Sequence, residues 1–253
     1  MDRLKGKTTI VTGSGQGIGR GIAMAFANEG ASVWVADYVP ERAKSVAEEI
    51  TKAGGVAYSD QVDVTKEDSV KGMFERAVGK FGHLDVLVNN AGVEVLKSIE
   101  ETTAEDFDRV FAVNVRGVFL CCKHAVPYFK KQGKGNIVNM GSSAGYIGAP
   151  FQTVYCASKG AVHQLTKALA VECTASNIRV NAIAPGGVKT AMLDYLSEEF
   201  LKRGIDIAAF SSMHMGGWST PEDIAQMAVY LASDESRSVH GAALLIDGGL
   251  TAA

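Results

Sequence analysis

The feature that most constrains the fold is a regular alternation of short β-branched segments with longer segments of helical periodicity. The pattern predicts strands at residues 8–12, 32–37, 56–61, 86–89, 136–140, 179–184 and 243–246. It predicts helices at residues 18–29, 40–52, 66–81, 104–131, 154–176 and 221–232, the last with Thr220 as its N-cap. Such alternation is typical of a doubly wound, mostly parallel α/β sheet with helices on both faces and buried apolar strands. No repeat or linker interrupts it, so we predict a single domain over residues 1–253.

Residues 186–217 break this regularity, because their periodicity is poor and glycines frame them. Such a segment is a candidate for a mobile substrate lid, which we place near residues 187–217. Its apolar side chains are first of all lid packing and core, but those that face the cleft would form an apolar pocket. They are Met192, Leu193, Tyr195, Leu196, Phe200, Leu201, Phe210, Met213, Met215 and Trp218.

Bulk composition argues against several classes of protein. Hydrophobic residues make up 47% of the 253 residues, which allows a large core and argues against disorder. The net charge of -3 gives no electrostatic reason to expect nucleic acid or an anionic membrane as partner. No apolar run reaches about eighteen residues, and the N-terminus lacks the apolar core of a signal peptide. We therefore expect no membrane span and a cytoplasmic location.

Thiol and imidazole side chains form no metal-binding pattern in the sequence, so no metal is predicted. No two cysteines form a Cys-x-x-Cys pair, and we expect all of them to be buried or half-buried free thiols. They are Cys121, Cys122, Cys156 and Cys173. The histidines have no ligand spacing with carboxylates or cysteines, and we expect them on the surface or on helix faces. They are His83, His124, His163, His214 and His240.

A glycine-rich turn lies between the first predicted strand and the first predicted helix. Its sequence is Thr12-Gly13-Ser14-Gly15-Gln16-Gly17-Ile18-Gly19. Glycines let the backbone approach a pyrophosphate closely, and the helix N-terminus offers free N–H groups and a positive dipole end. Flexible turns are also rich in glycine, but the strand–turn–helix context favours dinucleotide binding.

Asp37 ends the second predicted strand. It lies about twenty residues beyond the glycines, where a carboxylate accepts hydrogen bonds from the adenosine ribose hydroxyls. A carboxylate there would repel a 2′-phosphate, and neither Tyr38 nor Gln16 supplies the cation that a 2′-phosphate needs. The sequence therefore favours NAD over NADP. The alternative is that Asp37 is an ordinary turn residue at a strand end.

Further motifs resemble those of the short-chain dehydrogenase/reductase family, and the resemblance covers essentially the whole chain. They are Thr12-Gly13-x-x-x-Gly17-x-Gly19, Asp63-Val64, Asn89-Asn90-Ala91-Gly92, Pro185-Gly186-x-x-x-Thr190, and a tetrad of Asn114, Ser142, Tyr155 and Lys159. The resemblance implies a Rossmann-like sheet of about seven strands. It also implies a set of cofactor contacts. These are Gly13, Gln16, Gly17, Ile18, Gly19, Asp37, Tyr38, Asp63, Val64, Asn90, Ala91, Gly92, Tyr155, Lys159, Pro185, Gly186, Val188 and Thr190.

The spacing of Tyr155 and Lys159 suits acid–base chemistry. Residues four apart share one face of a helix, and an ammonium beside a phenol stabilises the phenolate and lowers its pKa. Tyr155 could then accept the proton of an alcohol or donate one to a carbonyl. Tyr-x-x-x-Lys pairs also occur on ordinary helices, so the pair alone proves little. The resemblance adds that Lys159 also bonds the nicotinamide ribose.

The two other members of the tetrad have roles implied by the resemblance. Ser142 would hold the substrate oxygen against the phenol of Tyr155, and the neighbouring Ser143 is the alternative for this role. Asn114 would hold a water that links Lys159 to solvent. A mid-helix asparagine is mildly unfavourable, which is a small independent sign that it has a task.

These observations predict an oxidoreductase that transfers a hydride between NAD and a secondary alcohol or ketone, a hydrophobic or cyclic one. The first alternative is a 3-oxoacyl thioester reductase of the same family, and the second is a non-catalytic dinucleotide-binding scaffold. The predicted long helices at 104–131 and 154–176 bear many small apolar residues. In this family such helices commonly build tetramers, so we expect a homotetramer, with a dimer as the alternative.

Overall fold

The computed structural model describes residues 2–207, 211–212 and 215–252. Phe210, Met213 and His214, which the sequence analysis named, lie outside these residues. The chain folds into a seven-stranded sheet in the order β3-β2-β1-β4-β5-β6-β7, with every neighbouring pair parallel. The strands are β1 (Thr8–Thr12), β2 (Ser32–Asp37), β3 (Val56–Gln61), β4 (Val86–Asn89), β5 (Gly135–Met140), β6 (Ile178–Pro185) and β7 (Ala243–Ile246).

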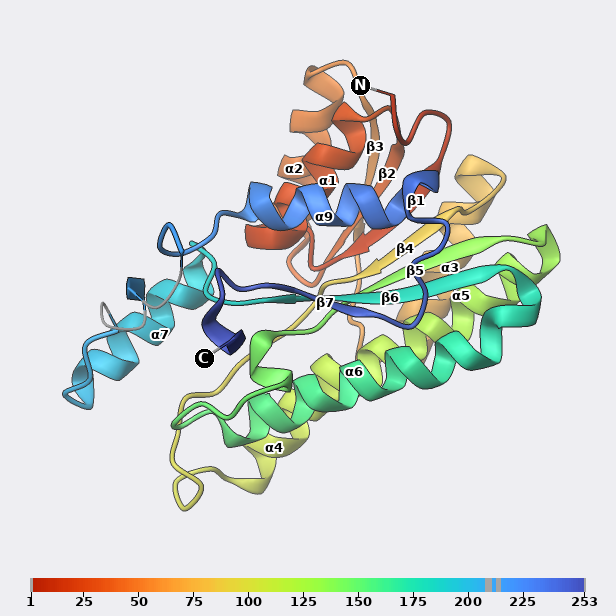
Figure 1. Ribbon diagram of the computed structural model, residues 1–253. Helices are drawn as coiled ribbons and strands as arrows, with labels where there is room; N and C mark the ends of the chain where they lie inside the picture. Colours follow the sequence, from red (N-terminus) through yellow and green to blue (C-terminus); the bar gives the residue numbers. More distant parts are fainter. Residues whose placement is uncertain (1, 208–210, 213–214, 253) are drawn as a thin grey trace.

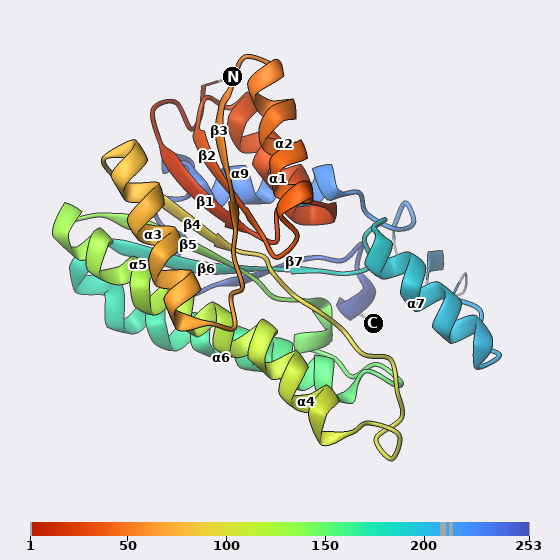
Figure 2. The same ribbon diagram turned by 180° about the vertical axis from the view of Figure 1, so that it is seen from behind.

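Helices cover both faces of this sheet, as Figures 1 and 2 show from opposite sides. The first face carries α1 (Gly17–Asn28), α2 (Pro40–Lys52) and α9 (Pro221–Ala232). The second face carries α3 (Glu67–Phe81), α4 (Ala104–Phe111), α5 (Val118–Gln132) and α6 (Thr153–Cys173). The doubly wound, Rossmann-like α/β fold predicted from the alternation is therefore confirmed, with a separate apolar core on each side of the sheet.

Most strand interiors are apolar and buried, but β3 and β7 are more exposed because they form the two edges of the sheet. The polar side chains of β3 are largely exposed, while Tyr58 packs against Trp34 and Phe81. The predicted strand ranges differ from the observed ones by at most one residue at either end. Thr220 caps α9 as predicted and forms a reciprocal capping box with Asp223.

The long helix predicted at 104–131 is not uniform. A π-helical segment at Ala112–Gly117 separates α4 from α5, so one turn contains an extra residue. Periodicity alone could not show this, because an inserted residue shifts the helical face without ending the helix. The other long helix ends earlier than predicted, at Cys173, and a 3-10 turn follows at Thr174–Ser176.

Within the described residues, one segment, Ala104–Gln132, is long and apolar enough by composition to cross a membrane. Its α5 part packs against α3, β4 and β5 on the second face of the sheet. Core helices of globular proteins can have the same length and apolar composition. Nearly half of the most apolar stretch of this segment is buried.

The segment predicted as a lid contains a helix that its poor periodicity did not reveal. This helix, α7 (Ala191–Lys202), projects from the carboxyl-terminal end of the sheet, away from both helix layers (Figure 1). Its apolar side chains do not repeat cleanly because both the cleft and solvent border it. Mobility of this segment stays a prediction.

Candidate active site

A cavity of about 990 Å³ opens at the carboxyl ends of the central strands. The strand order reverses between β1 and β4, and in open parallel sheets ligands bind in the crevice beside such a reversal. All of the site residues predicted from the sequence line this cavity except Gly19 and Asn114. The fold therefore brings together residues that are spread from Gly13 to Thr190 in the sequence.

The glycine turn is held closely against the turn after β4. The Asn90 side chain donates hydrogen bonds to the carbonyl oxygens of Thr12 and Gly13, at 3.0 and 2.9 Å. A Cβ on Gly13 would lie 2.8 Å from the Cα of Ala91, and one on Gly19 would lie 2.2 Å from the Gly13 oxygen. Larger residues would push the turn away from the cavity. The first turn of α1 contains no acidic residue, so its free N–H groups suit a pyrophosphate.

Asp37 lies at the other side of this turn, nearly buried at the end of β2. Its carboxylate accepts hydrogen bonds from the backbone N–H groups of Gly15, at 2.9 Å, and Val39, at 3.0 Å. These bonds fix the carboxylate beside the glycine turn, where it lines the cavity. Tyr38 also lines the cavity, but its side chain is 69% exposed.

Arg42 also lines this end of the cavity, and the sequence analysis missed it. It lies in the first turn of α2 and packs against the glycine turn, because a Cβ on Gly15 would come within 2.5 Å of the Arg42 Cβ. The only available signal was a cation five residues beyond Asp37. Besides Gln16 and Tyr38, which carry no charge, this end of the cavity therefore holds a cation that could pair with a 2′-phosphate.

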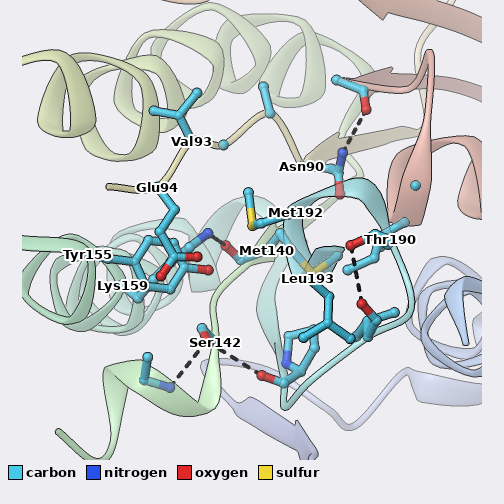
Figure 3. A pocket seen from close by; sticks show the side chains of 18 of the residues that line it. Asn90, Val93, Glu94, Met140, Ser142, Tyr155, Lys159, Thr190, Met192 and Leu193 are labelled. Atoms are coloured by element: carbon cyan, nitrogen blue, oxygen red, sulfur yellow. Dashed lines mark hydrogen bonds between the residues drawn. The ribbon is translucent and has the colours of Figure 1, made fainter. Parts of the chain in front are cut away.

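Ser142, Tyr155 and Lys159 meet at the other end of the cavity (Figure 3). The Ser142 hydroxyl accepts a hydrogen bond from the Ala144 N–H at 3.1 Å, and its polar contact with Tyr155 lowers the pKa of the phenol. Lys159 Nζ lies 5.6 Å from the centre of the Tyr155 ring and donates to the Met140 carbonyl at 2.8 Å. Ser142, rather than the neighbouring Ser143, is therefore the serine that contacts the phenol.

The pKa of Tyr155 is not lowered in the protein alone, contrary to the expectation from its spacing with Lys159. Burial raises the pKa of Tyr155 above that of a free phenol, and the Glu94 carboxylate raises it further. Burial also lowers the pKa of Lys159 to about 8, although Glu94 opposes this change. Desolvation penalises both the phenolate of Tyr155 and the ammonium of Lys159. In the protein without cofactor, Lys159 therefore does not bring the pKa of Tyr155 below that of a free phenol.

Asn114 does not line the cavity. It lies in the π-helical segment, where its amide donates to the Val93 carbonyl at 2.9 Å and to the Ser158 hydroxyl at 3.0 Å. Its side-chain oxygen accepts from the Val93 N–H at 2.8 Å. Both amide donors are thus used, which leaves one lone pair of the oxygen for a water. The visible task of Asn114 is to tie the segment after β4 to α6.

His163 lies on a helix face, one of the two placements expected from the sequence, but this face is buried at the site. The residue is only 5% exposed and stands one turn beyond Lys159 on α6. Its Nε2 accepts a hydrogen bond from the Ser142 N–H at 3.4 Å, and its ring packs against Tyr146. Burial, with help from Lys159 and Lys167, lowers its pKa to about 4, so it is a neutral acceptor. The signal was present as the spacing of four from Lys159 to His163.

Glu94 and Gln152 are two further cavity residues that the sequence analysis did not select. The Gln152 amide donates a short hydrogen bond to Oε1 of Glu94. In Figure 3 the Glu94 side chain lies beside Tyr155 and Lys159. Burial raises the pKa of Glu94 to about 7, although Gln152 and Lys159 lower it. The only sequence signal was an acidic residue directly after the Asn-Asn-Ala-Gly-Val motif.

The apolar wall expected from the lid segment is present in part. The lid residues that line the cavity are Met192, Leu193, Leu196, Phe200 and Trp218. Leu201 and Met215, by contrast, are 69% and 88% exposed, and they do not line it. The cysteines match their prediction, since Cys121, Cys122 and Cys173 are buried free thiols and Cys156 is half-buried.

Comparison with known proteins gives matches over the whole length of the chain. Residues 13–251 match the family described as enoyl-(acyl carrier protein) reductase. The chain is 41% identical to the 3-oxoacyl-(acyl-carrier-protein) reductase FabG of Thermotoga maritima, covering 98% of this chain and 99% of the relative. It is 38% identical to the cyclopentanol dehydrogenase of Comamonas testosteroni, covering 100% of both.

Solved structures agree with these relatives. A short-chain type dehydrogenase/reductase from Mycobacterium marinum has a TM-score of 0.93 at 35% identity and covers 99% of this chain and 97% of its own. A 3-ketoacyl-(acyl-carrier-protein) reductase from Brucella melitensis, complexed with NADH, has a TM-score of 0.88 at 37% identity and covers 98% and 99%.

Proposed function

Because the chain belongs to the short-chain dehydrogenase/reductase family and is an oxidoreductase, we propose that it is an NAD-dependent dehydrogenase acting on a secondary alcohol or its ketone. The observation that carries the proposal is the meeting of Ser142, Tyr155 and Lys159 at one end of a cavity whose other end is formed by the glycine turn and Asp37. One end suits the chemistry of an alcohol and the other suits a dinucleotide.

The residues around the cavity fit a dinucleotide. The glycine turn and the N-terminus of α1 would hold the pyrophosphate, and Asp37 would accept hydrogen bonds from the adenosine ribose. Lys159 would bond the nicotinamide ribose, and Thr190, which lies over Gly17, would hold the carboxamide. When bound, the oxidised dinucleotide would supply the hydride acceptor and a positive charge beside Tyr155.

The side chains at the chemical end would handle the proton. Ser142 and Tyr155 each offer a hydroxyl to the same substrate oxygen, which fixes its position. During oxidation Tyr155 takes the alcohol proton as the carbinol carbon loses its hydride, and during reduction it returns a proton to the carbonyl oxygen. Lys159 stabilises the phenolate that forms. His163 keeps the Ser142 backbone in place, because it accepts the hydrogen bond of the Ser142 N–H.

Asp37 supports a preference for NAD. Its carboxylate is held at the edge of the cavity by two backbone N–H groups and would repel a 2′-phosphate. Arg42 weakens this preference, because its guanidinium could pair with that phosphate. Asp37 is nearly buried and fixed, whereas the Arg42 side chain is exposed and therefore screened by solvent, so we expect the carboxylate to dominate.

A 3-oxoacyl thioester reductase is the second candidate. The 41% identity to such a reductase from Thermotoga maritima favours it, as does Arg42 if the cofactor is NADP. The cyclopentanol dehydrogenase at 38% identity favours the simple alcohol. The two candidates differ in substrate, and one experiment separates them.

The experiment is a panel of secondary alcohols with NAD or NADP, followed by the absorbance of the reduced cofactor, beside 3-oxoacyl thioester reduction. We expect alcohol oxidation with NAD to have the larger kcat/KM. A larger kcat/KM for 3-oxoacyl thioesters would establish the second candidate. Tight NAD binding without turnover of any alcohol, ketone or thioester would instead indicate a scaffold.

We also propose that the protein is a homotetramer. The homotetramer is supported by apolar side chains on the outer face of α5 and α6, where Phe119 is 51% and Val171 is 79% exposed. Sedimentation of the wild type and of Val171→Glu, which places a charge on this face, tests it. A cytoplasmic location and a single domain over residues 1–253 stay predictions.

A further inference from the structure

The Glu94 carboxyl occupies an unusual place for an acidic side chain. It follows β4 on the segment at the rim of the cavity and lies beside Tyr155 and Lys159 in Figure 3. Its charge acts on both of these residues and on Cys156. Glu94 is half-buried, and partial removal of a carboxyl from solvent costs stability, so its presence beside the reacting groups needs a reason.

The partners of Glu94 satisfy only part of its hydrogen-bonding capacity. Gln152 Nε2 donates to Oε1, and this is the only donor to the carboxyl in the part of the chain that the structure describes. Oε2 of Glu94 and Oε1 of Gln152 accept no hydrogen bond from these residues. Both side chains line the cavity. Together they present two unused acceptor oxygens at the wall of the cavity and one unused donor, the second amide hydrogen of Gln152.

A pair of acceptors in a substrate cleft selects for a donor on the substrate. The donor could be a hydroxyl or an ammonium. Lys159 lies beside Glu94, Arg109 lines the same cavity from α4, and the oxidised cofactor would add a further positive charge. This concentration of positive charge disfavours a cationic substrate and favours a neutral hydroxyl.

The position of the pair also limits where that hydroxyl sits. Ser142 and Tyr155 hold the reacting oxygen, and Glu94 stands beside Tyr155. Because the Glu94 side chain lies beside Tyr155, the second donor has to lie close to the reacting oxygen, and the adjacent carbon is the nearest position that can carry it. The part of the wall that the lid segment forms is apolar, with Met192, Leu193 and Phe200 among its side chains. It would take the hydrocarbon face of the substrate.

We propose that Glu94 and Gln152 make this enzyme selective for secondary alcohols that carry a second hydroxyl on the adjacent carbon, that is, for vicinal diols and the hydroxyketones they form. The inference rests on the proposed function and replaces the expectation of a purely apolar substrate. In the oxidation one carbinol loses a hydride to the nicotinamide and a proton to Tyr155. The second hydroxyl is only bound and does not react.

The test compares kcat/KM for cyclohexane-1,2-diol with that for cyclohexanol, using the full-length protein and NAD. We expect the wild type to prefer the diol roughly 10- to 100-fold, the range of a hydrogen bond to a desolvated charged group. Glu94→Gln replaces the charged acceptor by a weaker neutral one and should lower this ratio, and Gln152→Leu, which removes an acceptor, should lower it as well. Glu48→Gln makes the same chemical change on the exposed face of α2 and should leave the ratio as in the wild type.

The dependence of the ratio on pH separates a binding role from a structural one. A carboxylate is a stronger acceptor than a protonated acid, so the diol preference should grow as pH rises from about 6 to about 8 and Glu94 ionises. Tyr155, Cys156 and Lys159, on which Glu94 acts, are the same for both alcohols and cancel in the ratio, as does Arg109, which lines the same cavity. In Glu94→Gln the ratio should not change with pH.

The outcomes are distinguishable. If cyclohexanol is oxidised but the diol is not preferred, or if Glu94→Gln keeps the wild-type ratio while folding normally, the inference is wrong and the proposed function stands. A preference for 2-aminocyclohexanol over the diol also overturns it, in favour of a cationic substrate. If the wild type turns over none of these alcohols or their ketones, the proposed function itself fails.

Discussion

The backbone N–H of Ser142 donates a hydrogen bond to Nε2 of His163, at 3.4 Å. This contact joins the turn after β5 to the middle of α6, twenty-one residues apart in the sequence. It places the Ser142 hydroxyl next to Tyr155, and burial keeps the imidazole neutral so that Nε2 can accept. The geometry of the chemical end therefore depends on a histidine that need not touch substrate.

Replacement of His163 tests this dependence. His163→Leu removes the acceptor and should lower kcat roughly 10-fold with a smaller change in KM, because Ser142 loses its fixed position. His163→Gln places an amide oxygen near the former Nε2 and should restore much of kcat. Steady-state kinetics of both variants, with melting temperatures to control for folding, make the measurement. Equal losses in the two variants would show that packing, rather than the hydrogen bond, is what matters.

Tyr155→Phe removes the proposed proton acceptor. We expect turnover to fall roughly 100- to 10,000-fold, while NADH binding, measured by fluorescence titration, changes little. Tyr128→Phe is a matched control, because Tyr128 lies on α5 and does not line the cavity. Near-normal turnover in Tyr155→Phe would rule out the mechanism.

Asp37 and Arg42 act on cofactor choice in opposite directions. Asp37→Ala should lower the ratio of kcat/KM for NAD to that for NADP by roughly 10-fold or more, because the carboxylate no longer repels the 2′-phosphate. Arg42→Ala should raise the same ratio, because the phosphate loses the Arg42 guanidinium beside Gly15. The kinetics of each variant with both cofactors measure this. If Asp37→Ala leaves the ratio unchanged, another feature sets the preference.

Glu94 should also make stability depend on pH. Its pKa is raised from 4.5 to about 7 in the folded protein, so the folded state holds this proton more tightly than the unfolded chain. The stabilisation is complete below the unfolded pKa and is lost as pH rises through the folded pKa. Glu94→Gln cannot ionise. Its melting temperature, relative to the wild type, should therefore increase by on the order of 5 °C between about pH 4.5 and about pH 7.5.

Thermal melts of the wild type and Glu94→Gln across this range measure the difference. Other titrating groups, including His163, are common to both proteins and cancel when the two are subtracted. A constant difference in melting temperature would mean that Glu94 has an ordinary pKa in the folded protein.

Local patterns in the sequence determined the architecture and the cofactor end of the site. Strand and helix periodicities are properties of short windows, so the alternation predicted the parallel sheet. The glycine turn and Asp37 lie directly at strand ends, and parallel strands place their carboxyl ends at one edge of the sheet. Tyr155 and Lys159 share one helix face, so their proximity also follows from sequence spacing.

Contacts between distant segments, and the burial that accompanies them, were decided only by the tertiary structure. Gln152 meets Glu94 across fifty-eight residues, and Arg42 reaches the glycine turn, because the sheet brings these loops to one edge. The pKa of Tyr155 rises and that of Lys159 falls because the fold removes Lys159 from solvent and Tyr155 partly so, a property that no spacing reveals. The sequence thus predicted the acid–base pair, whereas the fold decided the pKa shifts of its two members and the polar groups that line the cavity around them.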